Sequence, residues 1–401
     1  MKKFFLIIIC LTVIVPLALV GCTKAATTTS AGNVLNIGAV WGLTGTDADI
    51  HGVMAKGETL CEAWINSNGG ITVNGVKYKI NVITLDTKST TEGAVTAAQQ
   101  LVFQNKVKFV TGQPTPAEVL AVRSITDPNK VFYMAATSDN LSPDYPYSFT
   151  ALYPYKWPKT PLYDYLVKTY PNVKTVAVMN QDEAGNVASG AEAIVQIQKH
   201  GLTLGDHEVY PFDTTDYLPV VTKVVNTHPD AIDMCLNMPS HAALIVKDAR
   251  QLGYKGPIFG GSPWDPSLML SIITPDYAND FFWPTFDPTA PENASQVPPE
   301  MSTVMKLWDD TYHVPFVLDC LQGWNALWTT TQAIEKANSL DPLTVAKAFE
   351  SMGTIDTGYG KSPIGGKQTY GINAVVCEPI PITRLENGKT EFEGFSPLNI
   401  P

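Results

Sequence analysis

The sequence has no cluster of lysine or arginine residues. Among its 401 residues, 27 are basic and 38 are acidic, which gives a formal net charge of −11. A protein that binds nucleic acid or anionic lipid through its surface needs a basic patch to neutralise phosphates. The charge pattern therefore argues against a nucleic-acid partner and against a protein face that adheres to membranes.

Cysteines are few and widely spaced. Four of the six follow the N-terminal segment: Cys61, Cys235, Cys320 and Cys377. None belongs to a C-x-x-C pair, so the spacing typical of zinc sites is absent and we expect no metal site. Two alternatives remain for these four residues. They form disulfides, with three possible pairings, or they are small buried apolar side chains.

Catalytic motifs are missing as well. The chain has no G-x-S-x-G turn and no H-E-x-x-H pair, which excludes two common hydrolase signatures. Residues 360–368 have the wrong glycine spacing for a phosphate-binding loop, and Gln368 stands where that loop needs a hydroxyl. We therefore expect neither an enzyme nor a cofactor. An extracytoplasmic hydrolase remains the enzymatic alternative.

A long apolar run occupies the N-terminus. Lys2 and Lys3 precede an apolar segment from Phe4 to Val20, which ends in Leu19-Val20-Gly21-Cys22. A charged start, an apolar core and small residues are typical of a secretory signal peptide, and the last four residues resemble a bacterial lipobox. An uncleaved membrane span is the alternative, because about 20 apolar residues suffice to cross a bilayer. We expect residues 1–21 to be removed and Cys22 to anchor an extracytoplasmic lipoprotein to the cell membrane.

The rest of the chain alternates between strand-like and helix-like segments. Residues 22–33 are small and polar and predict a flexible tether. Beyond them, apolar runs such as 79–85 and 107–110 each precede a helix-length segment, a pattern that predicts a parallel α/β sheet. The pattern restarts at 175–179 after a proline- and aromatic-rich break, so we predict two α/β lobes. Thr115-Pro116-Ala117-Glu118 predicts a helix start with a capping box.

Several segments, in order, resemble the leucine/isoleucine/valine-binding type of periplasmic solute-binding protein. They are Gly38 to Gly45, Ala63 to Ile71, Val110 to Pro114, Met134 to Ser138 and Ile382 to Lys389. The resemblance covers the whole mature body. It implies two Rossmann-like lobes joined by three crossings near Tyr153, Phe286 and Thr354. The first lobe would comprise 34–152 plus 286–353, and the second 153–285 plus 354–401.

The resemblance also implies a function. Proteins of this type close a hinge on a small-molecule ligand between the lobes, outside the carboxyl ends of the strands. They deliver it to the permease subunits of an importer driven by ATP hydrolysis. We expect this chain to do the same as a monomer. A ligand-sensing module for a membrane signalling partner is the alternative.

Candidate ligand-binding residues follow from the same resemblance. Ala135 and Thr137 match a loop that holds the ligand's carboxylate through main-chain groups and a hydroxyl, although an ordinary strand-end turn is the alternative. A ligand-binding serine of the family falls on Thr115 or Pro116, and the alternative role of Thr115 is to cap its own helix. His51 matches an aromatic residue that covers the ligand, and it either donates to a carboxylate or caps its loop.

Three positions in the second lobe depart from the family pattern. An aromatic residue of the family, beside a helix start, falls near Ala184. Ser240 stands where the family has a tyrosine, and the ammonium-binding glutamate falls on Pro263 or Trp264. Burying an ammonium group without an acid is costly, so the loss argues against a plain α-amino acid unless another acid compensates. The candidate acids are Asp182, Glu183 and Asp265.

Four tryptophans fall at predicted cleft positions: Trp41, Trp157, Trp264 and Trp283. Aromatic rings offer a large apolar contact area with defined stacking geometry, although several of these are alternatively core or hinge residues. We therefore expect a ligand that is carboxylated and apolar or aromatic.

Overall fold

The structure, a computed structural model, describes residues 33–401 except 139, 155, 238 and 261–266. The predicted signal peptide, most of the tether and Cys22 lie outside the described residues, and so does Trp264. No helix in the described part of the chain is long and apolar enough to cross a membrane.

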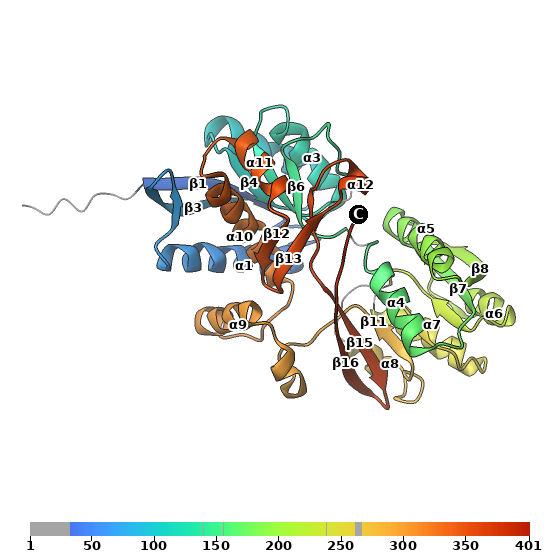
Figure 1. The fold of residues 1–401 in the computed structure, drawn as a ribbon. Helices are drawn as coiled ribbons and strands as arrows, with labels where there is room; N and C mark the ends of the chain where they lie inside the picture. Colours follow the sequence, from blue (N-terminus) through green and yellow to red (C-terminus); the bar gives the residue numbers. More distant parts are fainter. Residues whose placement is uncertain (1–32, 139, 155, 238, 261–266) are drawn as a thin grey trace, which may run out of the picture. The chain divides into compact units, whose positions relative to one another are not determined.

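The first lobe is built on a nine-stranded sheet with the order β12-β13-β14-β6-β5-β4-β1-β3-β2 (Figure 1). Its strands are β1 (Asn33–Trp41), β2 (Ile71–Val73), β3 (Val76–Asp86), β4 (Phe109–Gly112), β5 (Phe132–Thr137), β6 (Ser148–Leu152), β12 (Thr354–Thr357), β13 (Gly360–Gly365) and β14 (Val375–Val376). The five strands β3, β1, β4, β5 and β6 run parallel to one another.

Both faces of the central strands β4, β5 and β6 are buried, because helices cover each face. Phe132 and Met134 of β5 pack into one cluster with α1, α10 and α11, whereas Tyr133 and Ala135 pack on the other face with α2 and α3. The helices of this lobe are α1 (Ala48–Ser67), α2 (Thr91–Gln99), α3 (Pro116–Thr126), α9 (Pro299–Tyr312), α10 (Cys320–Ala337), α11 (Pro342–Ser351) and α12 (Lys367–Tyr370). A π-helical turn, η1 (Gln100–Gln104), extends α2, and a 3₁₀ turn, η2 (Pro291–Gln296), precedes α9.

The second lobe is built on a seven-stranded sheet with the order β16-β15-β11-β10-β9-β7-β8. Its strands are β7 (Thr175–Gln181), β8 (Thr203–Tyr210), β9 (Ala231–Asp233), β10 (Ile258–Phe259), β11 (Phe281–Trp283), β15 (Ile380–Glu386) and β16 (Lys389–Ser396). Its helices are α4 (Lys159–Thr169), α5 (Ala184–Lys199), α6 (Leu218–Asn226), α7 (Pro239–Gln251) and α8 (Ser267–Ile272). Helices α4 and α5 cover one face and α6 to α8 the other. The two α/β lobes confirm the predicted fold class.

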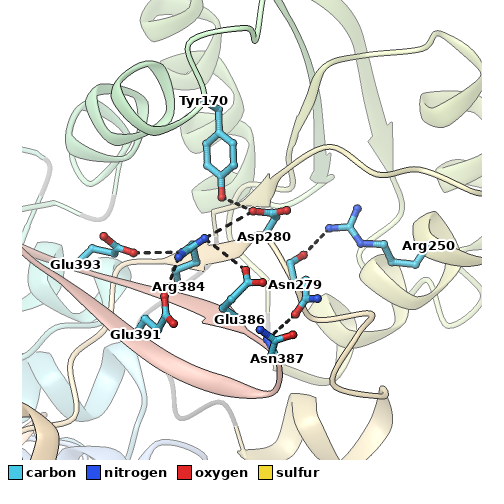
Figure 2. Close-up of polar contacts among 9 residues, drawn as sticks. All are labelled: Tyr170, Arg250, Asn279, Asp280, Arg384, Glu386, Asn387, Glu391 and Glu393. Carbon is cyan, nitrogen blue, oxygen red and sulfur yellow. Dashed lines mark hydrogen bonds and ion pairs between the residues drawn. The ribbon is translucent and has the colours of Figure 1, made fainter.

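A hairpin of β15 and β16 forms the edge of the second sheet. Asn387 and Gly388 connect its strands with φ angles of 52° and 72°, as a two-residue hairpin turn requires. The guanidinium of Arg384 lies among four acidic side chains (Figure 2): Asp280, Glu386, Glu391 and Glu393. Because Asp280 directly precedes β11, these contacts tie the hairpin to its neighbouring strand.

Two further contacts hold the segment before β11. Tyr170 donates to a carboxylate oxygen of Asp280 over 2.7 Å, and the backbone N–H of Asn387 donates to the side-chain oxygen of Asn279 over 2.6 Å. Arg250 of α7 donates to the backbone oxygen of Asn279 over 2.8 Å. Hydrogen bonds of Asn279 and Asp280 therefore link the end of α4, helix α7 and the hairpin to one another.

The chain passes between the two sheets more often than the resemblance implies. It leaves the first sheet after β6 and returns after β11. The third passage lies between Val376 and Ile380 rather than near Thr354, because β12 to β14 pair within the first sheet. After β16 the chain returns once more: Leu398 and Ile400 are buried in the first lobe's core.

The remaining sequence predictions have mixed outcomes. All four described cysteines are free and buried, which agrees with the second of the two alternatives. Helix α3 begins at Pro116 after Thr115, but the predicted capping box is wrong, since the Thr115 side chain makes no capping hydrogen bond. Glu118 instead accepts hydrogen bonds from Gln113 and Thr87.

Candidate functional site

Three loops meet at the carboxyl edge of the first sheet, where ligands of open α/β sheets bind. They follow β1, β3 and β4. Asp86, at the end of β3, accepts hydrogen bonds from the backbone N–H groups of Leu43 and Thr44 and from the Thr44 hydroxyl, over 2.6 to 3.2 Å. Ser89, in the β3 loop, donates to the backbone oxygen of Thr44 and accepts from the backbone N–H of Asp47. The β1 and β3 loops therefore hold one another in place.

His51 lies in the first turns of α1 and is 2 % exposed. Its Nδ1 accepts a hydrogen bond from the backbone N–H of Gly42 over 3.1 Å. Since a backbone N–H can only donate, Nδ1 carries no proton and the ring proton is on Nε2. Burial also lowers the pKa of His51, although nearby Asp47 opposes the shift. The imidazole is therefore a neutral donor through Nε2.

Thr115 is brought together with His51, as the sequence predicts for two residues of one site. Its hydroxyl lies 3.5 Å from Nε2 of His51 and 3.3 Å from a carboxylate oxygen of Asp47. Because His51 donates and the carboxylate accepts, the Thr115 hydroxyl receives one hydrogen bond and donates the other. The Thr115 hydroxyl can occupy this position because it does not cap α3.

Trp41 is fully buried, although the sequence places it at the ligand site. Its indole N–H donates to Glu58 of α1 over 2.6 Å. Gly112 has a φ of 98° and lies against the indole ring, where a Cβ would come within 3.0 Å of the ring. The ring centroid is 6.3 Å from that of His51. Trp41, the last residue of β1, is thus a buried packing residue that holds the start of the β1 loop in place.

Glu58 is a buried carboxyl group that no sequence motif indicates. Its carboxyl oxygens lie 2.6 Å from the indole nitrogen of Trp41, which donates, and 2.5 Å from the Thr111 hydroxyl. Burial is the largest influence on this carboxyl group and raises its pKa to about 7. From the sequence alone, a buried glutamate on a helix cannot be distinguished from an exposed one.

Ala135 and Thr137 belong to the last residues of β5 rather than to the loop after it, and both are buried. Ala135 pairs with Gly112 of β4. The Thr137 hydroxyl donates to the backbone oxygen of Tyr153 over 3.1 Å, where the chain leaves the first sheet. In this structure the hydroxyl is therefore engaged with the connecting segment.

The second lobe contributes a different set of groups at the carboxyl ends of its strands. Ser240 is half-buried in the first turn of α7. The ring of His241 lies 5.7 Å from that of Tyr217, which lies 5.7 Å from that of Tyr210. Tyr210 and Tyr217 were not identified from the sequence, because they lie outside the motifs that carry the resemblance.

The structure also describes some of the other tryptophans and acids that the sequence analysis names. Trp157 is 7 % exposed and donates to the Tyr370 hydroxyl over 3.1 Å, and Trp283 is fully buried in the second lobe's core. Glu183 caps α5 by accepting from the backbone N–H groups of Gly185 and Asn186. Trp264 and Asp265 lie outside the described residues.

Comparison with known families shows the family to which this chain belongs. Residues 34–389 match a family described as periplasmic binding protein. The chain belongs to this family. The match includes the loops described above and, apart from the last strand β16, the strands of both sheets.

Solved structures similar to this periplasmic binding protein share its fold over nearly their whole length. A leucine binding protein, LivK, from Thermotoga maritima is 20% identical with a TM-score of 0.69, over 91% of this chain and 99% of that one. LivJ from Streptococcus pneumoniae, a branched-chain amino acid transporter substrate binding protein in complex with isoleucine, is 19% identical with a TM-score of 0.68, over 91% and 99%. A solute binding protein from R. palustris in complex with benzoate is 13% identical with a TM-score of 0.65, over 92% and 98%.

Proposed function

We propose that this chain is the extracytoplasmic solute-binding lipoprotein of an ABC importer. It captures a small carboxylated ligand with an apolar or aromatic group between its two lobes and delivers it to permease subunits. The observation that carries the proposal is the family match across both lobes, together with the interlocked polar loops at the carboxyl edge of the first sheet. The N-terminal segment ending in Cys22 supports the location and the anchor.

The beginning of α3 supports a carboxylate on the ligand. Helix α3 starts at Pro116, which has no N–H, and Thr115 leaves the following N–H groups uncapped. The uncapped start of a helix attracts anions through these groups and through the helix dipole. The Thr115 hydroxyl lies at the same position, as expected for a group that helps to orient a carboxylate.

The relatives support the combination of a carboxylate with an apolar group. The ligands named for three of them are leucine, isoleucine and benzoate, and all three pair a carboxylate with a hydrocarbon part. The burial of Trp41, Trp157 and Trp283 removes them as exposed stacking surfaces. The aromatic half of the proposal therefore rests on the benzoate complex of the relative.

Calorimetry on the mature protein, unfolded and refolded to release any bound solute, tests the proposal. We expect binding of at least one of leucine, isoleucine and benzoate, no binding of a short polyol such as glycerol, and recovery of the ligand unchanged. Binding of the polyol alone contradicts the ligand class. Conversion of the ligand to product supports the hydrolase alternative instead.

A further inference from the structure

The second lobe exposes three apolar side chains at the carboxyl edge of its sheet. Phe212, in the loop after β8, is 63 % exposed, more than any other large apolar side chain of the described residues. Val187, in the first turn of α5, is 47 % exposed, and Leu218, at the start of α6, is 45 % exposed. These three residues are called the second-lobe patch below. Apolar side chains that are exposed together commonly mark a site of protein interaction.

The loop that carries Phe212 is held in place by hydrogen bonds. The backbone N–H and the hydroxyl of Thr214 both donate to the backbone oxygen of Pro211, over 3.1 and 2.7 Å. The side-chain amide of Gln181, at the end of β7, donates to the backbone oxygen of Phe212 over 3.3 Å. Because the backbone of this loop is already ordered, a partner that binds Phe212 pays little entropy to fix it.

The surroundings of the second-lobe patch are acidic. Residues 182–188 and 211–219 contain no basic side chain and four acidic ones, all of them exposed: Asp182, Glu183, Asp213 and Asp216. None of the four forms an ion pair with a basic side chain in the described part of the chain. An apolar centre that includes an aromatic ring, surrounded by polar groups, is typical of a protein interface.

The charge of this rim restricts the partner. An anionic lipid surface would be repelled, and a second copy of this chain would bring the same acids against one another. Juxtaposed like charges weaken an interface, whereas a complementary charge steers the partner and fixes its orientation. The rim therefore fits a protein surface on which lysine or arginine side chains surround an apolar pocket.

We propose that the second-lobe patch is a docking surface for the permease subunits of the importer. Phe212 enters an apolar pocket of a permease subunit, and the acidic rim pairs with basic side chains around that pocket. The inference rests on the proposed function and assigns part of the surface through which the protein meets its partner. The patch lies at the carboxyl edge of the second sheet, so docking places the permease beside the proposed ligand site.

Crosslinking in cells tests the contact directly. A photoreactive benzophenone analogue of phenylalanine replaces Phe212 in the full-length protein, and the crosslinked products are identified by mass spectrometry. We expect a crosslink to a permease subunit. The same analogue at Leu252 is the matched control, because this side chain is 40 % exposed in the same lobe but follows the far end of α7. It should give no such product.

Uptake measurements separate docking from ligand binding. The ligand is radiolabelled leucine, isoleucine or benzoate, whichever the calorimetry finds to bind. Phe212→Ser should slow uptake by about tenfold, because exposed aromatic anchors contribute much of the binding energy of an interface. Its affinity for the ligand should equal that of the unaltered protein. Asp213→Lys should also slow uptake, whereas Asp276→Lys, an exposed position before β11 at the opposite edge of the sheet, should not.

Three results would overturn the inference. They are a crosslink from position 212 to the first lobe of the same chain, a crosslink to a second copy, and the absence of any crosslink to a permease subunit. A Phe212→Ser variant with weakened ligand affinity would assign the patch to contacts made when the lobes close, and it too counts against docking. If none of the three ligands binds, the proposed ligand class is wrong, but the crosslink at position 212 still tests the docking surface.

Discussion

At the scale of single residues, the protons around Glu58 can be counted. The Thr111 hydroxyl lies 3.0 Å from the backbone oxygen of Gly38 and 2.5 Å from a carboxyl oxygen of Glu58. A hydroxyl has one proton to donate. If Thr111 donates to Gly38, Glu58 must carry a proton and donate it to Thr111, and every polar atom is then satisfied. The raised pKa of Glu58 agrees with this arrangement.

Glu58 should make the protein less stable as the pH rises from about 4.5 to 7. In this range the unfolded chain loses the proton, near the ordinary value of 4.5, while the folded chain keeps it to about 7. Glu58→Gln imitates the protonated form and should be more stable than the unaltered protein at pH 8, by about 2–3 kcal/mol, with little difference at pH 4.5. Urea unfolding at the two pH values measures this difference.

The exposed Glu92 offers a matched control for the same change. Glu92→Gln should follow the unaltered protein at both pH values, because this side chain stays in solvent. A Glu58→Gln variant whose stability changes with pH as the unaltered protein's does would show that Glu58 does not retain its proton in the folded state.

Residues of the site differ in how far the sequence could reveal them. His51 and Thr115 could be predicted from the resemblance because each follows closely after one of its segments, and the structure brings them together. Asp47 does not, because an aspartate before an apolar helix is most simply interpreted as a cap. Its actual orientation depends on Thr115, 68 residues further along the chain, and such a contact leaves no local pattern.

At the scale of elements, helices α1 and α10 pack with their backbones in close contact. A Cβ on Gly57 of α1 would lie 1.9 Å from the backbone oxygen of Cys320, and one on Gly323 of α10 would lie 1.8 Å from that of Met54. Backbone atoms cannot turn aside as a flexible side chain can. The two glycines therefore set the distance between these helices.

Gly57→Ala should lower the free energy of unfolding by about 2–3 kcal/mol, because the helices must separate and disturb the core around them. The control lies on the same helix. A methyl group added at Gly52 would have no atom within 4 Å, so Gly52→Ala should be neutral or stabilise by up to about 1 kcal/mol. Urea midpoints at constant slope measure both. Equal losses in the two variants would contradict the packing argument.

Helices and strands could be predicted from the sequence where the local pattern of apolar residues determines them. The strands and helices of both lobes follow from apolar runs separated by helix-length segments. The capping box at Thr115 fails because Gln113 and Thr87 engage Glu118. The third passage between sheets was misplaced because β14 has only two residues and owes its position to pairing with β6 and β13.

At the scale of the whole molecule, the proposed anchor decides where the protein works. Cys22→Ser should abolish lipid attachment and move the protein from the membrane fraction to the soluble fraction, or leave it unprocessed. Fractionation of cells and mass spectrometry of the mature N-terminus measure this. Cys10→Ser is the matched control and should change nothing, because Cys10 lies in the segment that we propose is removed. Residues 1–21 still attached to the unaltered protein in the membrane fraction would support the alternative of an uncleaved span.

Both ends of the described chain belong to the first lobe. Asn33 opens β1, and the backbone oxygens of Ile400 and Pro401 accept hydrogen bonds from Gly366 and Thr369. The second lobe is therefore built from two segments, one from α4 to β11 and one comprising β15 and β16, that are inserted between segments of the first. A fluorophore or fusion partner placed at either terminus reports on the first lobe alone. An optical sensor of ligand capture needs one of its two labels inside the inserted part, for example within α5 or β8.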